Sequence, residues 1–145
     1  MRSVCELNAR CFESDVPFNS CLGWWFALSP IVRPEPFEAA LQCLANLSCE
    51  QAQSEQARDC WNDATPAALA FHETFTTACE QKSQACDGVV DADCMVATTF
   101  GLSLPYYSAA FVDELHSCIS DQIDCDEFHL GFCLDQVAGP YGLEF

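Results

Sequence analysis

Residues 43–60 read CLANLSCEQAQSEQARDC and place three cysteines in one short stretch. Residues 118–133, CISDQIDCDEFHLGFC, repeat this arrangement. The whole chain resolves into four such triplets: Cys5, Cys11, Cys21; Cys43, Cys49, Cys60; Cys79, Cys86, Cys94; Cys118, Cys125, Cys133. Their first members lie 38, 36 and 39 residues apart, and a proline follows each triplet, at Pro30, Pro66, Pro105 and Pro140. A fixed period, with a proline after the cysteines of each unit, indicates a stacked supersecondary repeat.

The apolar residues inside each repeat follow a helical spacing. Phe37, Leu41 and Leu44 are four and three residues apart, which places them on one helical face. The same steps recur at Phe71, Phe75, Ala78 and at Phe111, Leu115, Cys118. Ser48–Gln51 and Asp124–Glu127 resemble N-cap boxes and open a second helix at the middle cysteine. We therefore predict an all-α fold of four disulfide-stapled helical-hairpin repeats of about 38 residues.

The repeats define one predicted domain over residues 1–145. Its hairpins are expected at 1–34, 35–64, 65–103 and 104–138, and residues 139–145 begin a further repeat. PYGLEF, which includes Pro140, Tyr141, Leu143 and Phe145, resembles the helix start PYYSAAF at 105–111. The first repeat lacks most of its first helix, so an identical copy placed head to tail can complete it. Such heterologous contacts form filaments or rings.

Three cysteines cannot all pair within one repeat, so a fully oxidised repeat sends at least one bond to another. The middle and third cysteines are too far apart along an intact helix, because a disulfide needs its Cα atoms within about 7 Å. The first cysteine is then expected to close its hairpin with one partner while the other reaches a neighbouring repeat. We predict that the first and middle cysteines pair within a repeat and that the third cysteine bonds between repeats, as a geometric preference among many alternatives.

Composition excludes several classes of protein. Five basic against 22 acidic residues give a net charge of −17, which disfavours nucleic acid and anionic membrane surfaces. The longest apolar run, Cys21–Val32, is too short to span a bilayer. Twelve cysteines predict an oxidising location: extracellular, cell-surface or periplasmic. MRSVCELNAR is too short and polar for a signal peptide, so we expect a processed or engineered start at which Met1 need not be native.

Catalytic and metal motifs are missing. The chain has no Cys-x-x-Cys pair, and His72, His116 and His129 are isolated, so no cofactor is predicted. His72-Glu73 begins like a metalloprotease motif, but Thr76 stands where its second histidine belongs. Asp87, Asp91 and Asp93 can together offer oxygens to calcium, although EF-hand spacing is absent and a solvated acidic loop is the default. We predict a non-enzymatic protein without a metal centre.

Trp24 and Trp25 are the most conspicuous side chains. Trp24 shares a helical face with Ala27 and Leu28, which favours a core position. Adjacent residues point about 100° apart on a helix, so one face cannot bury both rings, and Trp25 is either core or interface. Tryptophan is enriched in binding hot spots, which makes both residues candidates for assembly or ligand binding.

The units CLANLSCEQAQSEQARDCW and CISDQIDCDEFHLGFCL, in acidic and alanine-rich surroundings, resemble cysteine-rich secreted helical proteins of myxobacteria and related bacteria. The resemblance rests on cysteine spacing and composition and covers most of the chain. It implies an exported helical fold and supplies no catalytic residues.

Two functions follow as expectations. The first is an exported structural subunit that self-associates head to tail in an extracellular assembly cross-linked by disulfides. The second is a monomeric secreted module that binds a protein, glycan or cation through an aromatic or acidic surface.

Overall fold

The computed structural model describes residues 1–12, 18–87, 94, 102–121 and 130–143. These residues are mostly helical and contain no β-strand, which confirms the all-α prediction. The contacts divide the chain into two compact units, an N-terminal unit (Met1–Pro66) and a C-terminal unit (Ala67–Phe145). The boundary falls next to the predicted junction of the second and third repeats. Four equivalent repeats stay a prediction.

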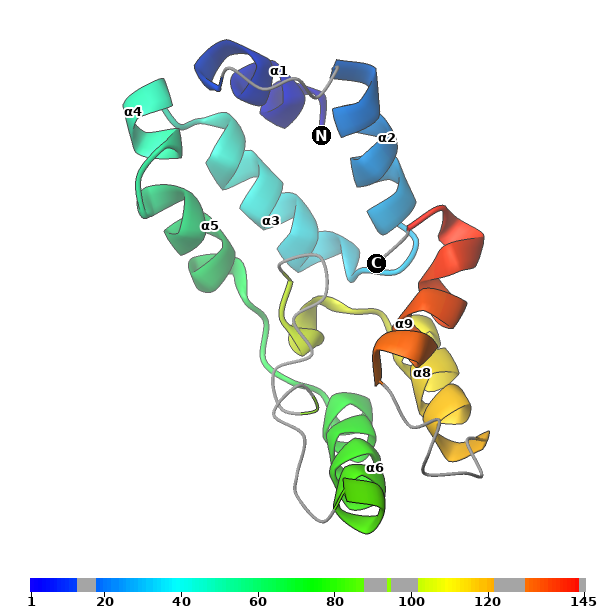
Figure 1. The fold of residues 1–145 in the computed structure, drawn as a ribbon. Coiled ribbons are helices and arrows are strands. Elements are labelled where there is room, and N and C mark those ends of the chain that lie inside the picture. Colours follow the sequence, from blue (N-terminus) through cyan, green and yellow to red (C-terminus); the bar gives the residue numbers. More distant parts are fainter. Residues whose placement is uncertain (13–17, 88–93, 95–101, 122–129, 144–145) are drawn as a thin grey trace. The chain divides into compact units, whose positions relative to one another are not determined.

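The N-terminal unit contains five helices: α1 (Arg2–Cys11), α2 (Phe18–Leu28), α3 (Pro34–Ala45), α4 (Cys49–Ala52) and α5 (Gln56–Ala64). Helix α1 packs on α2, α3 and α4, while α3 lies beside α5 (Figure 1). Helix α3 begins at Pro34, whose missing N–H costs nothing at a helix start. Its apolar stripe of Phe37, Leu41 and Leu44 is buried, as the spacing predicted.

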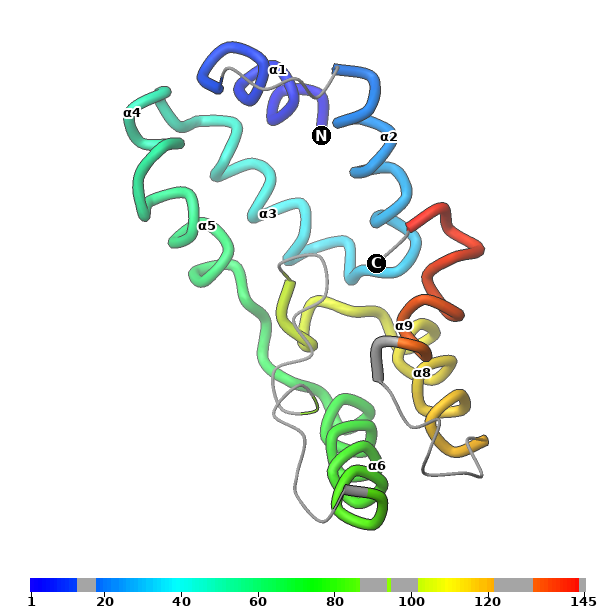
Figure 2. Tube along the Cα trace, in the orientation of Figure 1, coloured from blue at the N-terminus to red at the C-terminus, as the bar shows by residue number. Residues whose placement is uncertain are grey.

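Helix α4 starts where the sequence predicted. The Ser48 hydroxyl accepts a hydrogen bond from the Gln51 backbone N–H at 3.3 Å, and the Gln51 side chain accepts one from the Ser48 N–H at 2.8 Å. This capping box satisfies two N–H groups that have no partner inside the helix. The predicted second helix is not continuous, however. It ends at Ala52, and α5 begins at Gln56 (Figure 2).

Replacing Ser48 with alanine removes the cap of α4. We expect the free energy of unfolding of the N-terminal unit to fall by about 1 kcal/mol, because an N-cap serine contributes that much. Ser48→Thr keeps the hydroxyl and should retain most of this stability. Urea unfolding followed by tryptophan fluorescence measures both. Equal losses in the two variants would contradict the capping role.

The described part of the C-terminal unit contains α6 (Ala70–Asp87), η1 (Leu104–Tyr106), α8 (Ala109–Asp121), α9 (Leu130–Ala138) and η3 (Gly139–Tyr141). Helix α8 packs against both α6 and α9. Phe111, Leu115 and Phe75 are buried as predicted, whereas Phe71 and Ala78 are half-buried. The two Pro-Tyr segments, compared above by sequence, both form a single turn of 3₁₀-helix.

The disulfides pair differently from the prediction. First and third cysteines are bonded within every triplet: Cys5–Cys21, Cys43–Cys60, Cys79–Cys94 and Cys118–Cys133. The middle cysteines Cys11 and Cys49 join two neighbouring triplets, with their Cα atoms 4.9 Å apart. One cysteine per triplet therefore does reach a neighbour, but it is the middle one. Cys86 is also disulfide-bonded, and Cys125 lies outside the described residues.

The physical reason is helix length. Cys5 and Cys11 lie on one uninterrupted helix, as do Cys79 and Cys86. Six residues of helix separate the first pair by about 9 Å, too far for a disulfide. In the second triplet a turn does separate the first and middle cysteines, because Asn46 ends one helix and Ser48 starts the next.

Candidate functional site

A pocket of about 550 Å³ opens within the N-terminal unit. Its lining comes mainly from α1 and α2, while α3, α4 and α5 contribute one residue each. Its apolar lining comprises Val4, Leu7, Phe12, Cys21, Trp24, Trp25, Leu44, Ala52 and Ala57. Among the described residues of the lining, Asn8 and Ser20 are the polar ones, and none is charged. The size and composition are those of a small-molecule site.

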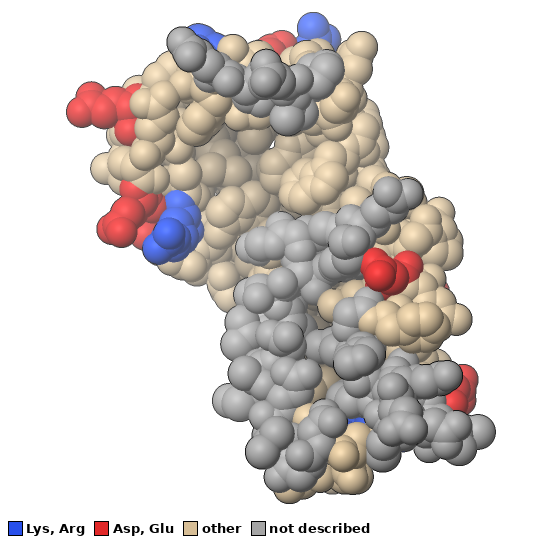
Figure 3. Space-filling view, in the orientation of Figure 1, with Lys and Arg blue, Asp and Glu red and all other residues tan. Residues whose placement is uncertain are grey.

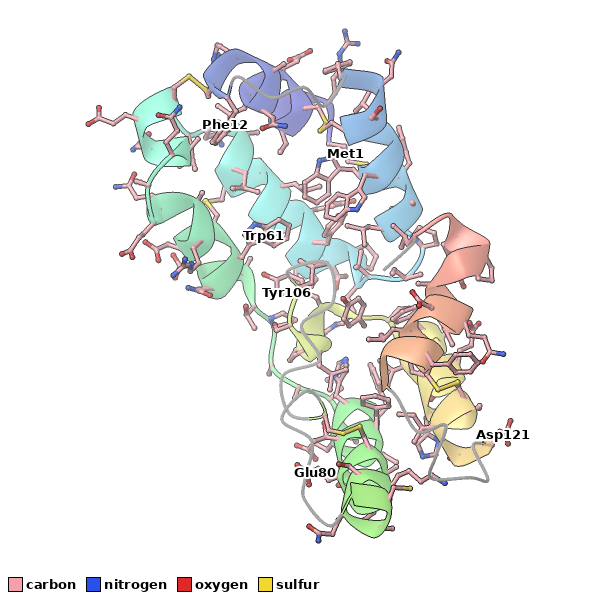
Figure 4. All side chains as sticks on the ribbon, viewed as in Figure 1. Met1, Phe12, Trp61, Glu80, Tyr106 and Asp121 are labelled. Carbon is pink, nitrogen blue, oxygen red and sulfur yellow. A yellow bond between two sulfur atoms is a disulfide. The ribbon has the colours of Figure 1, made fainter. Side chains whose placement is uncertain are left out.

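An aromatic cluster borders the pocket. The Trp25 ring reaches from α2 to Phe37 of α3, with ring centroids 5.7 Å apart, and stacks on Trp61 of α5 at 6.0 Å. Phe37 and Trp61 are themselves 6.2 Å apart. Trp61 extends from α5 toward α3 (Figure 4). These ring contacts link α2 to α3 and to α5 beside the pocket.

Two large apolar side chains of the lining remain exposed. Trp24 is 38% exposed and Phe12 39%, although both belong to the pocket wall. The Trp24 ring meets the edge of Trp25, with centroids 4.6 Å apart. In the space-filling view, the described side chains beside a hollow on this face of the N-terminal unit are uncharged (Figure 3).

Trp24 does not occupy its predicted core position. Trp24 was expected in the core with Ala27 and Leu28, but only Leu28 is fully buried. Trp25 is half-buried and makes the ring contacts with the core residue Phe37. The prediction failed for Trp24 because this side chain lines the pocket instead of packing into the core. The pocket residues of α1 and α5 were not identified from the sequence.

Covalent bonds hold the pocket walls. All six cysteines of the N-terminal unit lie in described residues and form three disulfides. Cys5–Cys21 ties α1 to α2, Cys43–Cys60 ties α3 to α5, and Cys11–Cys49 ties α1 to α4. The Gln53 amide also donates a hydrogen bond to the Cys11 carbonyl beside the last of these bridges.

The C-terminal candidates lie at the end of the described part of the chain. Pro140 and Tyr141 belong to η3, and Leu143 is 2% exposed, so it is already buried in its own chain. Gly142 has φ +76°, a left-handed conformation that glycine adopts without strain, and this ends the helical segment. Phe145 lies outside the described residues.

The metal candidates are not assembled in the described residues. Asp91 and Asp93 lie outside the described ranges, and Asp87 is the last residue of α6. Within those ranges no group of three or more histidine, cysteine or acidic side chains is placed to hold a metal ion. The helices of the described ranges also include none with the length and hydropathy needed to cross a bilayer.

His72 has a structural role in the C-terminal unit. Its ring is 1% exposed, Nδ1 accepts a hydrogen bond from the Leu69 N–H at 2.9 Å, and Nε2 lies 3.1 Å from the Tyr107 carbonyl oxygen. Nε2 therefore carries the proton and donates to Tyr107, because Nδ1 is occupied as an acceptor. The ring links the start of α6 to the segment that precedes α8.

No protein-family model, curated protein or solved structure matches the chain. The resemblance to secreted proteins of myxobacteria stays a prediction.

Proposed function

We propose that the protein is an exported, non-enzymatic binding module whose N-terminal unit holds a small apolar molecule. The observation that carries this proposal is the pocket of about 550 Å³ with an uncharged lining that includes Trp24 and Trp25. Pockets of this size that are mainly apolar, with a few polar groups, are the usual sites for small ligands.

The exposed aromatic rings support a binding role. Phe12 and Trp24 lie on the pocket wall, yet each leaves more than a third of its surface in water. Exposed apolar groups gathered around a concavity mark ligand and interaction sites more often than scattered ones do. A ligand that covers these rings gains the free energy of their removal from water.

The disulfides support it as well. They tie the helices around the pocket in the free protein, so less conformational entropy is lost when a ligand binds. The many disulfides are compatible with an extracellular protein, which fits the proposed export. Cys21 of the lining is oxidised in a disulfide, and the described lining residues include no acid or base.

A neutral fluorescent probe, N-phenyl-naphthylamine, tests the pocket. We expect saturable binding with one site per chain and energy transfer from tryptophan, because all three tryptophans (Trp24, Trp25, Trp61) lie in the N-terminal unit. Ala57→Leu adds atoms inside the pocket and should weaken binding by at least about tenfold. Ala39→Leu, on an exposed position of α3, is the matched control and should bind like the wild type.

Three results would argue against the proposal. They are the absence of saturable binding, equal weakening by the two leucine variants, and binding that produces no energy transfer. Circular dichroism of both variants shows whether each one is folded.

Head-to-tail assembly stays a prediction of the sequence. Leu143, one of its four C-terminal contact residues, is buried within its own chain and is not available to a neighbouring copy. The pocket therefore supports the binding module better than the structural subunit.

A further inference from the structure

We infer that the ligand is an uncharged amphiphile: an apolar chain or ring that carries one hydrogen-bonding head, such as an alcohol, ester or amide. The head lies between Asn8 and Ser20, and the apolar body lies against Trp24 and Trp25. This inference rests on the proposed function and adds the chemical class of the ligand.

The charge distribution excludes an anionic head. No lysine, arginine or histidine lines the pocket, so a carboxylate or phosphate would lose its water without gaining a counter-charge. The N-terminal unit itself carries four basic and nine acidic residues, a net charge of −5. That field repels anions as well. A fatty acid in its ionised form therefore fits poorly.

A cationic head is also disfavoured. The described lining residues include no carboxylate, so none of them would pair with an ammonium group buried there. The remaining acidic residues of the chain, 13 against a single lysine, belong to the C-terminal unit. Those residues can attract a cation only over a long range, and salt screens this attraction. An ion pair inside the pocket would be screened much less.

Two polar side chains mark the end of the pocket where a head can bind. Asn8 lies one helical turn beyond Cys5 on α1, and Ser20 directly precedes Cys21 on α2. The Cys5–Cys21 bridge, with its Cα atoms 5.8 Å apart, brings these two positions into one neighbourhood. Within the described part of the chain, neither side chain has a hydrogen-bond partner. Amide and hydroxyl together can donate to and accept from a neutral head.

The remaining lining suits the apolar body. Trp24 and Trp25 come from α2, while Leu7 of α1 and Leu44 of α3 face the same pocket. Tryptophan contributes a large apolar area with few rotatable bonds, so the contact is gained at low entropic cost.

Displacement of the fluorescent probe by three ten-carbon compounds tests the head group. Decanol, decanoate and decyltrimethylammonium share one chain, and each is used below its micelle-forming concentration in salt that screens the net charge. We expect the affinity of decanol, obtained from displacement of the probe, to be at least about tenfold higher than that of either ion. If decanoate or the ammonium compound binds as well as decanol, the uncharged class is wrong while the pocket function stands.

The Asn8→Leu variant tests the anchor. Leucine is close to asparagine in size and keeps the pocket filled, so decanol should bind about three- to tenfold more weakly, the loss of one hydrogen bond. Naphthalene has no head group and should bind unchanged. Asn19→Leu, exposed on α2 and outside the lining, is the matched control and should leave both ligands unaffected.

The outcomes separate the two proposals. If Asn8→Leu weakens the binding of decanol and naphthalene equally, or weakens neither, Asn8 is not the anchor of the head group, although the pocket binds both compounds. If neither compound displaces the probe from the wild type, or the probe does not bind, the proposed function itself fails.

Discussion

Replacing Phe37 with alanine is expected to lower the free energy of unfolding of the N-terminal unit by about 3–5 kcal/mol. The Phe37 ring is 1% exposed and contacts both Trp25 and Trp61. Its removal leaves a cavity at the point where α2, α3 and α5 meet, and it also removes two aromatic contacts. Urea unfolding followed by tryptophan fluorescence measures the loss.

Phe26→Ala is the matched control for Phe37→Ala. Phe26 lies on α2, is 62% exposed and is not part of the pocket, so its truncation should change the free energy by less than about 0.5 kcal/mol. Tryptophan fluorescence reports this unit alone, because the three tyrosines lie in the C-terminal unit and the three tryptophans in this one. Similar losses for the two phenylalanines would show that Phe37 is not the centre of this core.

The double variant Cys11→Ala, Cys49→Ala should be the second large perturbation. This bridge joins two cysteines that are 38 residues apart, the largest sequence separation among the described disulfides. On the loop-entropy estimate, its loss lowers the free energy of unfolding by about 4 kcal/mol. It also frees α1 from α4, so we expect weaker binding of the fluorescent probe. Unfolding in urea and probe titration measure these effects.

The control is the double variant Cys43→Ala, Cys60→Ala. That bridge closes a separation of only 17 residues and ties α3 to α5 within one hairpin. Its removal should cost about 3 kcal/mol and affect probe binding less, because α1 remains linked to α4. A greater loss of probe binding in this control than in the Cys11, Cys49 variant would contradict the role assigned to the Cys11–Cys49 bridge.

Local helix signals were predicted well from the sequence. The apolar spacing of Phe37, Leu41 and Leu44 identified the buried face of α3, and the capping box at Ser48 located the start of α4. Both signals depend on residues within one or two helical turns, and residues that are this close in sequence are also close in space.

Disulfide pairing was not predicted, because it depends on where each helix ends. Between Cys5 and Cys11 the sequence ELNAR contains no glycine, proline or cap that stops a helix, whereas LANLS between Cys43 and Cys49 contains both a stop and a start. Comparing these two segments would have favoured first-to-third pairing in the first triplet. The equal spacing of the triplets concealed the difference.

The pocket could not be predicted from the sequence either. The tryptophans were identified as candidates, but the exposure of Trp24 depends on how far α2 lies from α3. That distance is set by long-range features, among them the Trp25–Phe37 contact and the bridge between Cys5 and Cys21. Asn8 and Ser20 have no sequence signal of their own, and only the disulfide brings them together.

The central claim is that the N-terminal pocket binds an uncharged apolar ligand. The most direct test is an NMR titration with decanol that follows the three tryptophan indole N–H signals and the backbone amides. We predict saturable shifts for Trp24, Trp25 and the amides around Asn8 and Ser20, with little change in α6 and α8. Shifts that do not saturate, or that fall mainly on the C-terminal unit, would contradict the claim.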